Sequence, residues 1–225
     1  NLCGPRARDV LQSVTDDDVS NAALPYMRAR EIRLGYSPVS ALRVSYVGEL
    51  GWELHVPMEY AQHVYETLRD AGAAHGIADV GYRAISSLRL EKQYLYWGAD
   101  ISPDETPFEA GLGFAVSMKK NVDFVGRAAL DRQKQAGVQR RLCWFNTDAS
   151  ANLHGGEAIV LGDRVVGYTT SGGYGYTVGR SIACGYLAVG DIATEGYAIE
   201  AFGERFPTKR HEKPLYDPEG TRLRS

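Results

Sequence analysis

The sequence predicts an α+β protein, in which a mixed domain with an antiparallel sheet is followed by a small all-β barrel. Residues 42–56 alternate between polar and apolar on either side of a glycine-flanked turn, which is typical of a β-hairpin. Several later stretches carry apolar residues at helical spacing. From about residue 140, short β-type runs recur at the spacing of a small barrel. We therefore expect one domain over residues 1–137 and a barrel domain over residues 138–225.

The first domain is expected to open with a short helix after Gly4-Pro5, since proline is favoured at the first helical position. A strand over 27–34 and a turn at 35–38 should follow, and the hairpin should turn tightly around Gly48 and Gly51. Helical spacing predicts helices over 58–71, 82–92 and 124–136. The apolar run 111–118 (GLGFAVSM) is expected to form a short strand.

The barrel is expected to use strands at 142–145, 158–160, 164–170, 182–189 and 197–202. The glycine string over 172–179 resembles a nucleotide-binding loop, but it lies among strands and no helix follows it. Turn glycines explain it better. No FAD-binding or NAD-binding domain is therefore expected within this chain.

Composition excludes several classes of function. A net charge of -3 gives no reason to expect a nucleic-acid or anionic-membrane partner, and no apolar run is long enough to span a membrane. The histidines lack metal-binding spacing, so no metal site is expected. The widely separated Cys3, Cys143 and Cys184 suggest buried free thiols in a reducing compartment, the cytoplasm or alternatively the mitochondrial matrix. The chain starts without methionine, which suggests a fragment of a longer protein.

The stretch SYVGELGWELHVP (45–57) places the carboxylate of Glu49 between Gly48 and Gly51. A glutamate offers two coplanar acceptors, which match the paired N–H donors on a planar heterocycle such as a 2-amino-4-oxo-pyrimidine. Glycines allow such a ring to approach the backbone closely. From spacing alone, a solvated glutamate in a turn remains the alternative.

Several stretches together resemble the tetrahydrofolate-dependent aminomethyltransferases, the T-protein family of the glycine cleavage system. The 45–57 stretch resembles the family's Gly-Tyr-Thr-Gly-Glu hairpin, and GYRAISSLRLEK (81–92) resembles its Ala-Arg-Asp-Ser-Leu-Arg-Leu-Glu helix. Residues 96–112, 166–174 and 182–186 also resemble the family. VGELGWEL, YWGAD and the closing PLYDPEG (214–220) are similar to the C-terminal part of dimethylglycine and sarcosine dehydrogenases.

That resemblance implies an enzyme with tetrahydrofolate as its cofactor. In this branch, an upstream FAD module, absent from this chain, oxidises an N-methyl amine. The resulting iminium then meets tetrahydrofolate in the aminomethyltransferase-like module, which gives methylenetetrahydrofolate. The family's key aspartate lies N-terminal to anything present here, so no catalytic residue is assigned and the chain is expected to hold about one wall of the site.

The resemblance also assigns binding residues. Glu49 matches the glutamate that binds the pterin ring, and Arg83 matches an arginine that pairs with the carboxylate of the folate tail. Tyr46 and Trp52 flank the site, and either could lie along the pterin face, although strand alternation fits Trp52 equally well as a core residue. Tyr174 lies in a loop that is expected to close over the tail.

Two other functions remain open. The regulatory subunit of pyruvate dehydrogenase phosphatase resembles the same branch, which would make this chain a non-catalytic folate-binding or regulatory module. A stand-alone glycine-cleavage aminomethyltransferase is the other alternative, and the PLYDPEG stretch counts against it.

Overall fold

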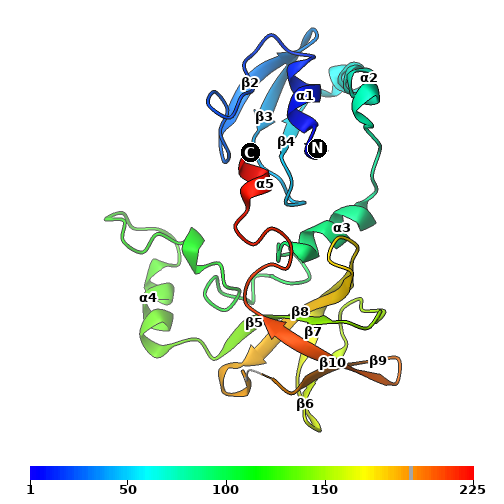
Figure 1. The fold of residues 1–225 in the computed structure, drawn as a ribbon. Coiled ribbons are helices and arrows are strands. Elements are labelled where there is room, and N and C mark those ends of the chain that lie inside the picture. Colours follow the sequence, from blue (N-terminus) through cyan, green and yellow to red (C-terminus); the bar gives the residue numbers. More distant parts are fainter. Residues whose placement is uncertain (193–194) are drawn as a thin grey trace. The chain divides into compact units, whose positions relative to one another are not determined.

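The computed structural model describes residues 1–192 and 195–225, which form two compact units (Figure 1). The first unit consists of Asn1–Lys92 together with Leu215–Ser225, and the second of Gln93–Pro214. The division predicted at residue 137 falls inside the second unit and stays a prediction about functional domains. Both units combine helices with antiparallel strands, as the α+β prediction requires.

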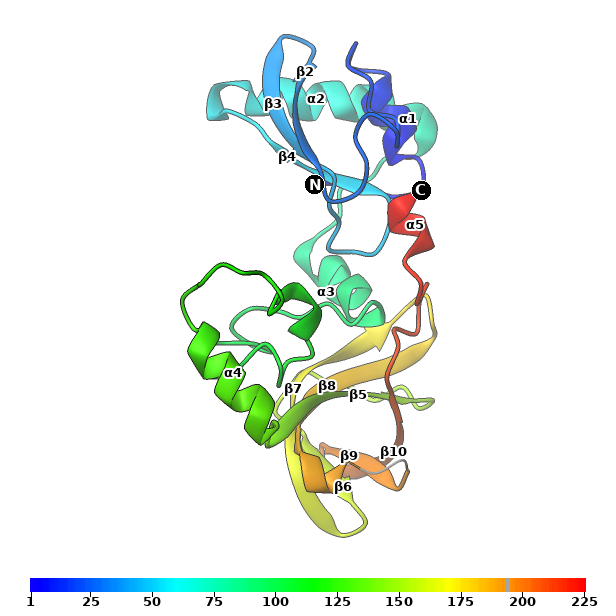
Figure 2. The same ribbon diagram turned by 90° about the vertical axis from the view of Figure 1, so that its left-hand side faces the viewer.

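The first unit is built on a four-stranded antiparallel sheet in the order β1-β4-β3-β2. Its strands are β1 (Leu2–Cys3), β2 (Ala29–Leu34), β3 (Ser37–Leu42) and β4 (Gly51–His55). Helices α1 (Ala7–Gln12) and α2 (Ala61–Gly72) lie beside the sheet (Figure 2) and contribute to the same apolar core. The fully buried members of this core include Leu11, Val19, Leu34, Ala41 and Trp52.

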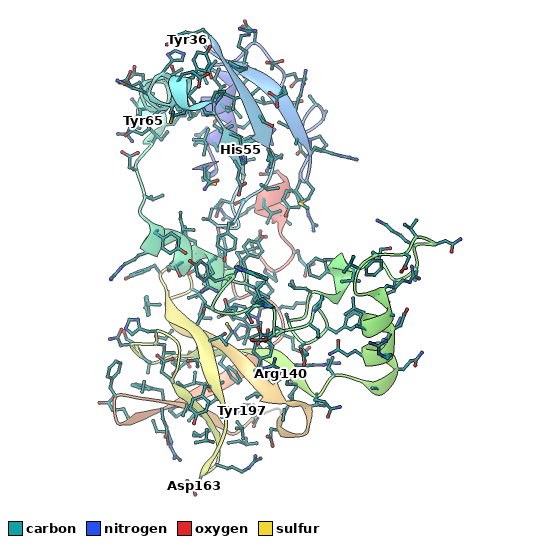
Figure 3. All side chains as sticks on the ribbon, turned by 180° about the vertical axis from the view of Figure 1, so that it is seen from behind. Tyr36, His55, Tyr65, Arg140, Asp163 and Tyr197 are labelled. Atoms are coloured by element: carbon teal, nitrogen blue, oxygen red, sulfur yellow. The ribbon has the colours of Figure 1, made fainter. Side chains whose placement is uncertain are left out.

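The β2–β3 hairpin is fixed against α2 by an aromatic contact. Tyr36, at the tip of the hairpin and marked in Figure 3, stacks on His63 of α2 with ring centroids 3.7 Å apart. Gly35 makes the turn with φ +56, and a side chain there would collide with the His63 ring. The turn predicted over 35–38 is shorter than expected and covers only residues 35 and 36, because Ser37 and Pro38 already belong to β3.

The loop that carries Glu49 differs from the predicted tight hairpin. β3 ends at Leu42 and β4 begins at Gly51, so residues 43–50 form a longer loop. At Arg43 the chain stays bonded on the β2 side, since its backbone N–H donates to the Arg28 carbonyl (2.8 Å) and its carbonyl accepts from the Met27 N–H (2.9 Å), while pairing with β4 stops at Leu42. The alternation that predicted a strand through Tyr46 fails at this buried arginine.

The remaining helices of the first unit mostly follow the predictions. The helix predicted over 58–71 is the short η1 (Met58–Tyr60) followed by α2, and the η2 turn (Ala73–His75) closes it. The helix predicted over 82–92 is α3 (Tyr82–Glu91). A short C-terminal helix, α5 (Thr221–Arg224), was not predicted, and its Leu223 is buried.

The second unit contains a closed antiparallel barrel with the strand order β10-β5-β8-β7-β6-β9. Its strands are β5 (Arg140–Thr147), β6 (Ala158–Leu161), β7 (Arg164–Gly175), β8 (Arg180–Ala188), β9 (Tyr197–Ala201) and β10 (Glu204–His211). The η4 turn (Val189–Asp191) follows β8. The predicted barrel is confirmed, and β10 is the one strand of it that the sequence did not predict. The glycine string lies in β7 and in the turn to β8, as turn glycines and strand residues.

The segment before the barrel contains helix α4 (Arg127–Ala136) and the short η3 turn (Gly113–Ala115). The strand predicted over 111–118 is wrong. Gly111 has φ +75, and Phe114 is 88% exposed. The backbone of this apolar run is therefore not extended like a strand, and its largest side chain is not buried.

Buried polar contacts hold this segment on the barrel. The carboxylate of Asp100 is fully buried and accepts hydrogen bonds from the Thr170 hydroxyl (2.7 Å) and the Cys184 thiol (3.2 Å). Arg140, marked in Figure 3, pairs with Glu105 at 3.2 Å and with Glu109 at 3.5 Å. The YWGAD stretch therefore has a structural role in this unit.

Cys143 and Cys184 are buried free thiols, but Cys3, in the two-residue edge strand β1, is an exposed residue, contrary to expectation. In residues 1–192 and 195–225, no helix is long and apolar enough to cross a bilayer. The same residues contain no cluster of three or more acidic, histidine or cysteine side chains suited to a metal ion.

Candidate functional site

Glu49 lies in the loop between β3 and β4 with a carboxylate that is already held. Its side chain is 18% exposed. The Tyr216 hydroxyl donates a hydrogen bond to Oε1, and Nη1 of Arg222 lies 3.7 Å from the same oxygen. Within the described chain, Oε2 accepts no hydrogen bond. The solvated turn glutamate is therefore ruled out, and one carboxylate oxygen remains open to a donor.

Tyr216 is itself fixed by its surroundings. Its backbone N–H donates to the Glu91 carbonyl (3.2 Å), and its ring lies 5.9 Å from Nζ of Lys92 and 5.3 Å from Cζ of Arg222. Burial, together with the hydrogen bond to Glu49, raises the pKa of Tyr216 to about 12. The phenol is therefore a protonated donor throughout the physiological pH range.

Lys92 connects the Glu49 loop to the C-terminal segment. Its side chain is only 3% exposed, and Nζ donates to the backbone carbonyl and, at 3.4 Å, to the carboxylate of Asp217. The methylene chain of Lys92 passes directly under Gly48, which has φ +77. A Cβ at Gly48 would lie 2.3 Å from Cγ of Lys92. The position before Glu49 must therefore be glycine.

We expect Gly48→Ala to lower the free energy of unfolding by about 2–3 kcal/mol, because it combines a left-handed backbone with displacement of an anchored side chain. Gly76→Ala is the matched control, since Gly76 has φ +71 with nothing within 4 Å of the added carbon. Urea denaturation of both variants separates the cost of the left-handed backbone, which both share, from the cost of displacing Lys92, which only Gly48→Ala carries. Equal losses would show that Lys92 moves aside freely.

Asp217 should give the first unit a marked acid sensitivity. Burial raises the pKa of Asp217, but hydrogen bonds from Thr221 and Arg222 and the charge of Lys92 outweigh it and lower the pKa to about 2. The stabilisation is thus complete above the ordinary pKa of 3.8 and is lost as the pH falls toward 2. We expect the stability difference between wild type and Asp217→Asn to shrink over this window in denaturant titrations. A constant difference would contradict the assignment.

Two of the other predicted residues lie in the first unit. Tyr46 is half-buried in the same loop as Glu49. Arg83 is exposed in the first turn of α3, and it forms no hydrogen bond or ion pair with any residue that the structure describes. It is therefore available to a ligand carboxylate.

The register of the α3 motif bears on Arg83. When Ser87-Leu88-Arg89-Leu90-Glu91 is superimposed on the shared Ser-Leu-Arg-Leu-Glu of the family helix, the family's arginine falls on Ile85, two residues after Arg83. Residues two apart do not share a helix face. Arg83 thus stays a prediction that rests on its exposure and charge.

Trp52 and Tyr174 have different surroundings. Trp52 is fully buried, with the guanidinium carbon of Arg43 4.8 Å and that of Arg8 5.3 Å from its ring centre. It is a core residue, and the alternative on the pterin face is wrong. Tyr174 lies in β7 of the second unit, where its half-buried ring contacts Tyr176 edge-on at 5.1 Å. The loop expected at Tyr174 is therefore wrong, because this residue belongs to a barrel strand, and its role over the folate tail stays a prediction.

Sequence reasoning missed Tyr216, Arg222 and Lys92 as members of this site. Tyr216 follows Glu49 by 167 positions, so no local pattern could pair them. The only signal was the PLYDPEG stretch, which resembles the dehydrogenase branch but did not indicate a role for Tyr216.

A separate groove in the second unit has a volume of about 960 Å³. Its lining is apolar and basic, including Phe114, Met118, Trp144, Arg141 and Arg210. Glu109 also lines it, but one of its oxygens already accepts from the backbone N–H (2.9 Å) and hydroxyl (3.1 Å) of Thr106. The other oxygen of Glu109 lies 3.5 Å from Nε of Arg140, so both of its oxygens have a partner, whereas only one oxygen of Glu49 is held.

Comparison with known proteins gives two family matches. Residues 1–120 match the GCVT N-terminal domain, and residues 140–217 match the glycine cleavage T-protein C-terminal barrel domain. Mitochondrial sarcosine dehydrogenase of Mus musculus is 40% identical over 232 residues, covering 100% of this chain and 25% of the relative. Mitochondrial dimethylglycine dehydrogenase of Mus musculus is 38% identical over 226 residues, covering 99% of this chain and 26% of the relative.

A solved structure gives the same result. The crystal structure of the glycine cleavage system aminomethyltransferase T from Bartonella henselae matches with a TM-score of 0.82 and 27% identity, over 96% of this chain and 58% of that chain. This chain thus spans about a quarter of the length of the dehydrogenases it matches, 25% and 26%.

Proposed function

Because the chain belongs to the glycine cleavage T-protein family, we propose that it is the tetrahydrofolate-binding, one-carbon-transfer module of an FAD-dependent N-methyl amine oxidoreductase. Its similarity to sarcosine and dimethylglycine dehydrogenases over nearly its whole length supports the oxidoreductase context. In this proposal the upstream FAD module and the N-methylated amine are the partner and the substrate of the whole protein. The compartment is a reducing one, the cytoplasm or the mitochondrial matrix.

The half-buried carboxylate of Glu49 carries the proposal. One of its oxygens is held by Tyr216, and the other is open. A carboxylate in this state can accept the two parallel N–H donors of a 2-amino-4-oxo-pyrimidine edge, since each oxygen has two lone pairs. Low exposure strengthens such bonds because water competes less. These features fit the pteridine ring of a reduced folate.

Folate, when bound, supplies a nucleophilic nitrogen that accepts the one-carbon unit. The residues of this chain bind and orient. Glu49 fixes the pteridine edge, Tyr46 lies along the ring, and the exposed guanidinium of Arg83 pairs with the carboxylates of the tail. Positioning of this kind can supply on the order of 7–11 kcal/mol of rate acceleration. No residue of the chain is assigned an acid–base role.

Calorimetric titration of the full-length protein with tetrahydrofolate under anaerobic conditions tests the proposal. We expect saturable binding to the oxidised and the reduced protein alike. p-Aminobenzoylglutamate, which has the tail but lacks the pteridine, is the matched control and should bind far more weakly. Absence of tetrahydrofolate binding, or equal binding of the two ligands, would overturn the proposal.

A non-catalytic, regulatory module is the second candidate, because the chain itself presents a binding carboxylate without an assigned catalytic group. A measurement of catalytic turnover distinguishes the transfer module from the regulatory module. Formation of methylenetetrahydrofolate from sarcosine or dimethylglycine supports the transfer module, whereas tight folate binding without any turnover supports the regulatory one.

A further inference from the structure

The C-terminal segment, residues 215–225, folds back onto the first unit and is anchored at both of its ends. At the far end, the Ser225 carbonyl accepts hydrogen bonds from Arg8 (2.6 Å) and from the buried Arg43 (2.7 Å), and Leu223 is buried beside them. Helix α5 consequently lies next to the sheet in Figure 1. Arg43 is the first residue of the loop 43–50 that carries Glu49, so the segment holds one end of that loop directly.

The near end of the segment is a rigid turn around Asp217. One carboxylate oxygen accepts from the Thr221 backbone N–H (3.0 Å) and hydroxyl (2.7 Å), while the other accepts from the Arg222 backbone N–H (3.2 Å). Lys92 adds its two bonds to the same residue. These contacts leave little freedom to the neighbouring Tyr216, whose backbone is also bound to Glu91.

We propose that Tyr216 is a positioning residue for ligand binding, whose hydroxyl fixes the orientation of the Glu49 carboxylate and leaves Oε2 directed to the ligand. The inference rests on the proposed function, since it names the group that sets the folate-binding geometry. A glutamate carboxylate turns freely about its terminal bonds, and holding it in one orientation otherwise costs rotamer entropy at the moment of binding. A donor anchored on a rigid turn removes that cost beforehand.

Arg222 cannot take this role by itself. Its side chain is 54% exposed, and its nitrogen lies 3.7 Å from Oε1, beyond hydrogen-bonding distance. Exposed pairs of this kind contribute little, since water and salt screen them. The hydroxyl of Tyr216 forms the direct hydrogen bond, and Arg222 covers the phenol ring from one side.

The test uses Tyr216→Phe in the full-length protein, with tetrahydrofolate affinity measured by calorimetry. Phenylalanine keeps the ring between Lys92 and Arg222 and removes only the hydroxyl. We expect affinity to fall about tenfold, the effect of losing one hydrogen bond to a charged group. Tyr36→Phe is the matched control, because Tyr36 is exposed and its hydroxyl bonds to no residue that the structure describes.

A double-mutant cycle separates positioning from a structural effect. If Tyr216 acts through Glu49, then Tyr216→Phe should cause no further loss in a Glu49→Gln background, because the amide that Tyr216 still holds presents a donor and no longer an acceptor to the ligand. Equal losses in both backgrounds, or an unchanged affinity of Tyr216→Phe, would overturn the inference while the proposed function stands. A wild-type protein that does not bind tetrahydrofolate would overturn both. Thermal unfolding of each variant checks that the first unit is folded.

Discussion

Replacing Glu49 by Gln is expected to weaken tetrahydrofolate binding by about 10- to 100-fold while the first unit stays folded. The amide keeps the size of the side chain and one acceptor oxygen, but it loses the charge and turns one acceptor into a donor that faces the ligand's N–H groups. Hydrogen bonds to a charged partner contribute about 1.5–3 kcal/mol, which gives the expected range.

Stability should change by less than about 1 kcal/mol, because the amide oxygen still accepts from Tyr216 and the exposed partner Arg222 contributes little. Glu53→Gln is the matched control. Glu53 lies in the adjacent strand β4, 42% exposed, with a weak contact to His55 at 3.6 Å. The Glu53→Gln variant should bind tetrahydrofolate with the affinity of the wild type. Unchanged affinity of Glu49→Gln would refute the role of Glu49.

Trp52→Ala is expected to destabilise the first unit by about 3–5 kcal/mol, as for other buried tryptophans. Trp52 is completely buried in the core of the unit and packs between the guanidinium groups of Arg43 and Arg8. Truncation leaves a large cavity and removes both cation–π contacts. Because Arg43 begins the loop that carries Glu49, folate binding should weaken as well.

Guanidinium chloride denaturation followed by circular dichroism measures this effect. Trp97→Ala is the control, since Trp97 is 66% exposed in the second unit and should change the free energy of unfolding by no more than about 0.5 kcal/mol. A loss below about 1 kcal/mol for Trp52→Ala would show that the core can collapse around the missing ring.

The fold could be predicted wherever burial left a periodic pattern. α2, α3 and most barrel strands carry apolar residues at helical or alternating spacing. β10 carries no such pattern, because Thr208 is its only buried residue and most of its other positions carry charged or basic side chains, so only pairing with β9 and β5 defines it. The 111–118 run failed for the opposite reason, since it is apolar but exposed.

The residues of the candidate site likewise fall into those that the sequence predicted and those that it did not. Glu49 was found because glycines flank it and a resemblance supports it. Its partners could not be found, because Tyr216 and Lys92 reach it from distant parts of the chain. The alternation expected of the hairpin fails at the buried Arg43 for a related reason. A charged residue within a strand pattern is ordinarily assigned to the surface, and here the Ser225 carbonyl and the Trp52 ring allow its burial.

The separation of 167 positions between Glu49 and Tyr216 has a consequence for biosynthesis. A ribosome releases the N-terminal strands long before the segment that immobilises the carboxylate, and loop closure over such a distance is slow. The nascent sheet can assemble early, yet its acidic loop acquires a fixed shape only after translation has passed the entire barrel. The contact between Glu49 and Tyr216 can therefore form only after both units have been synthesised.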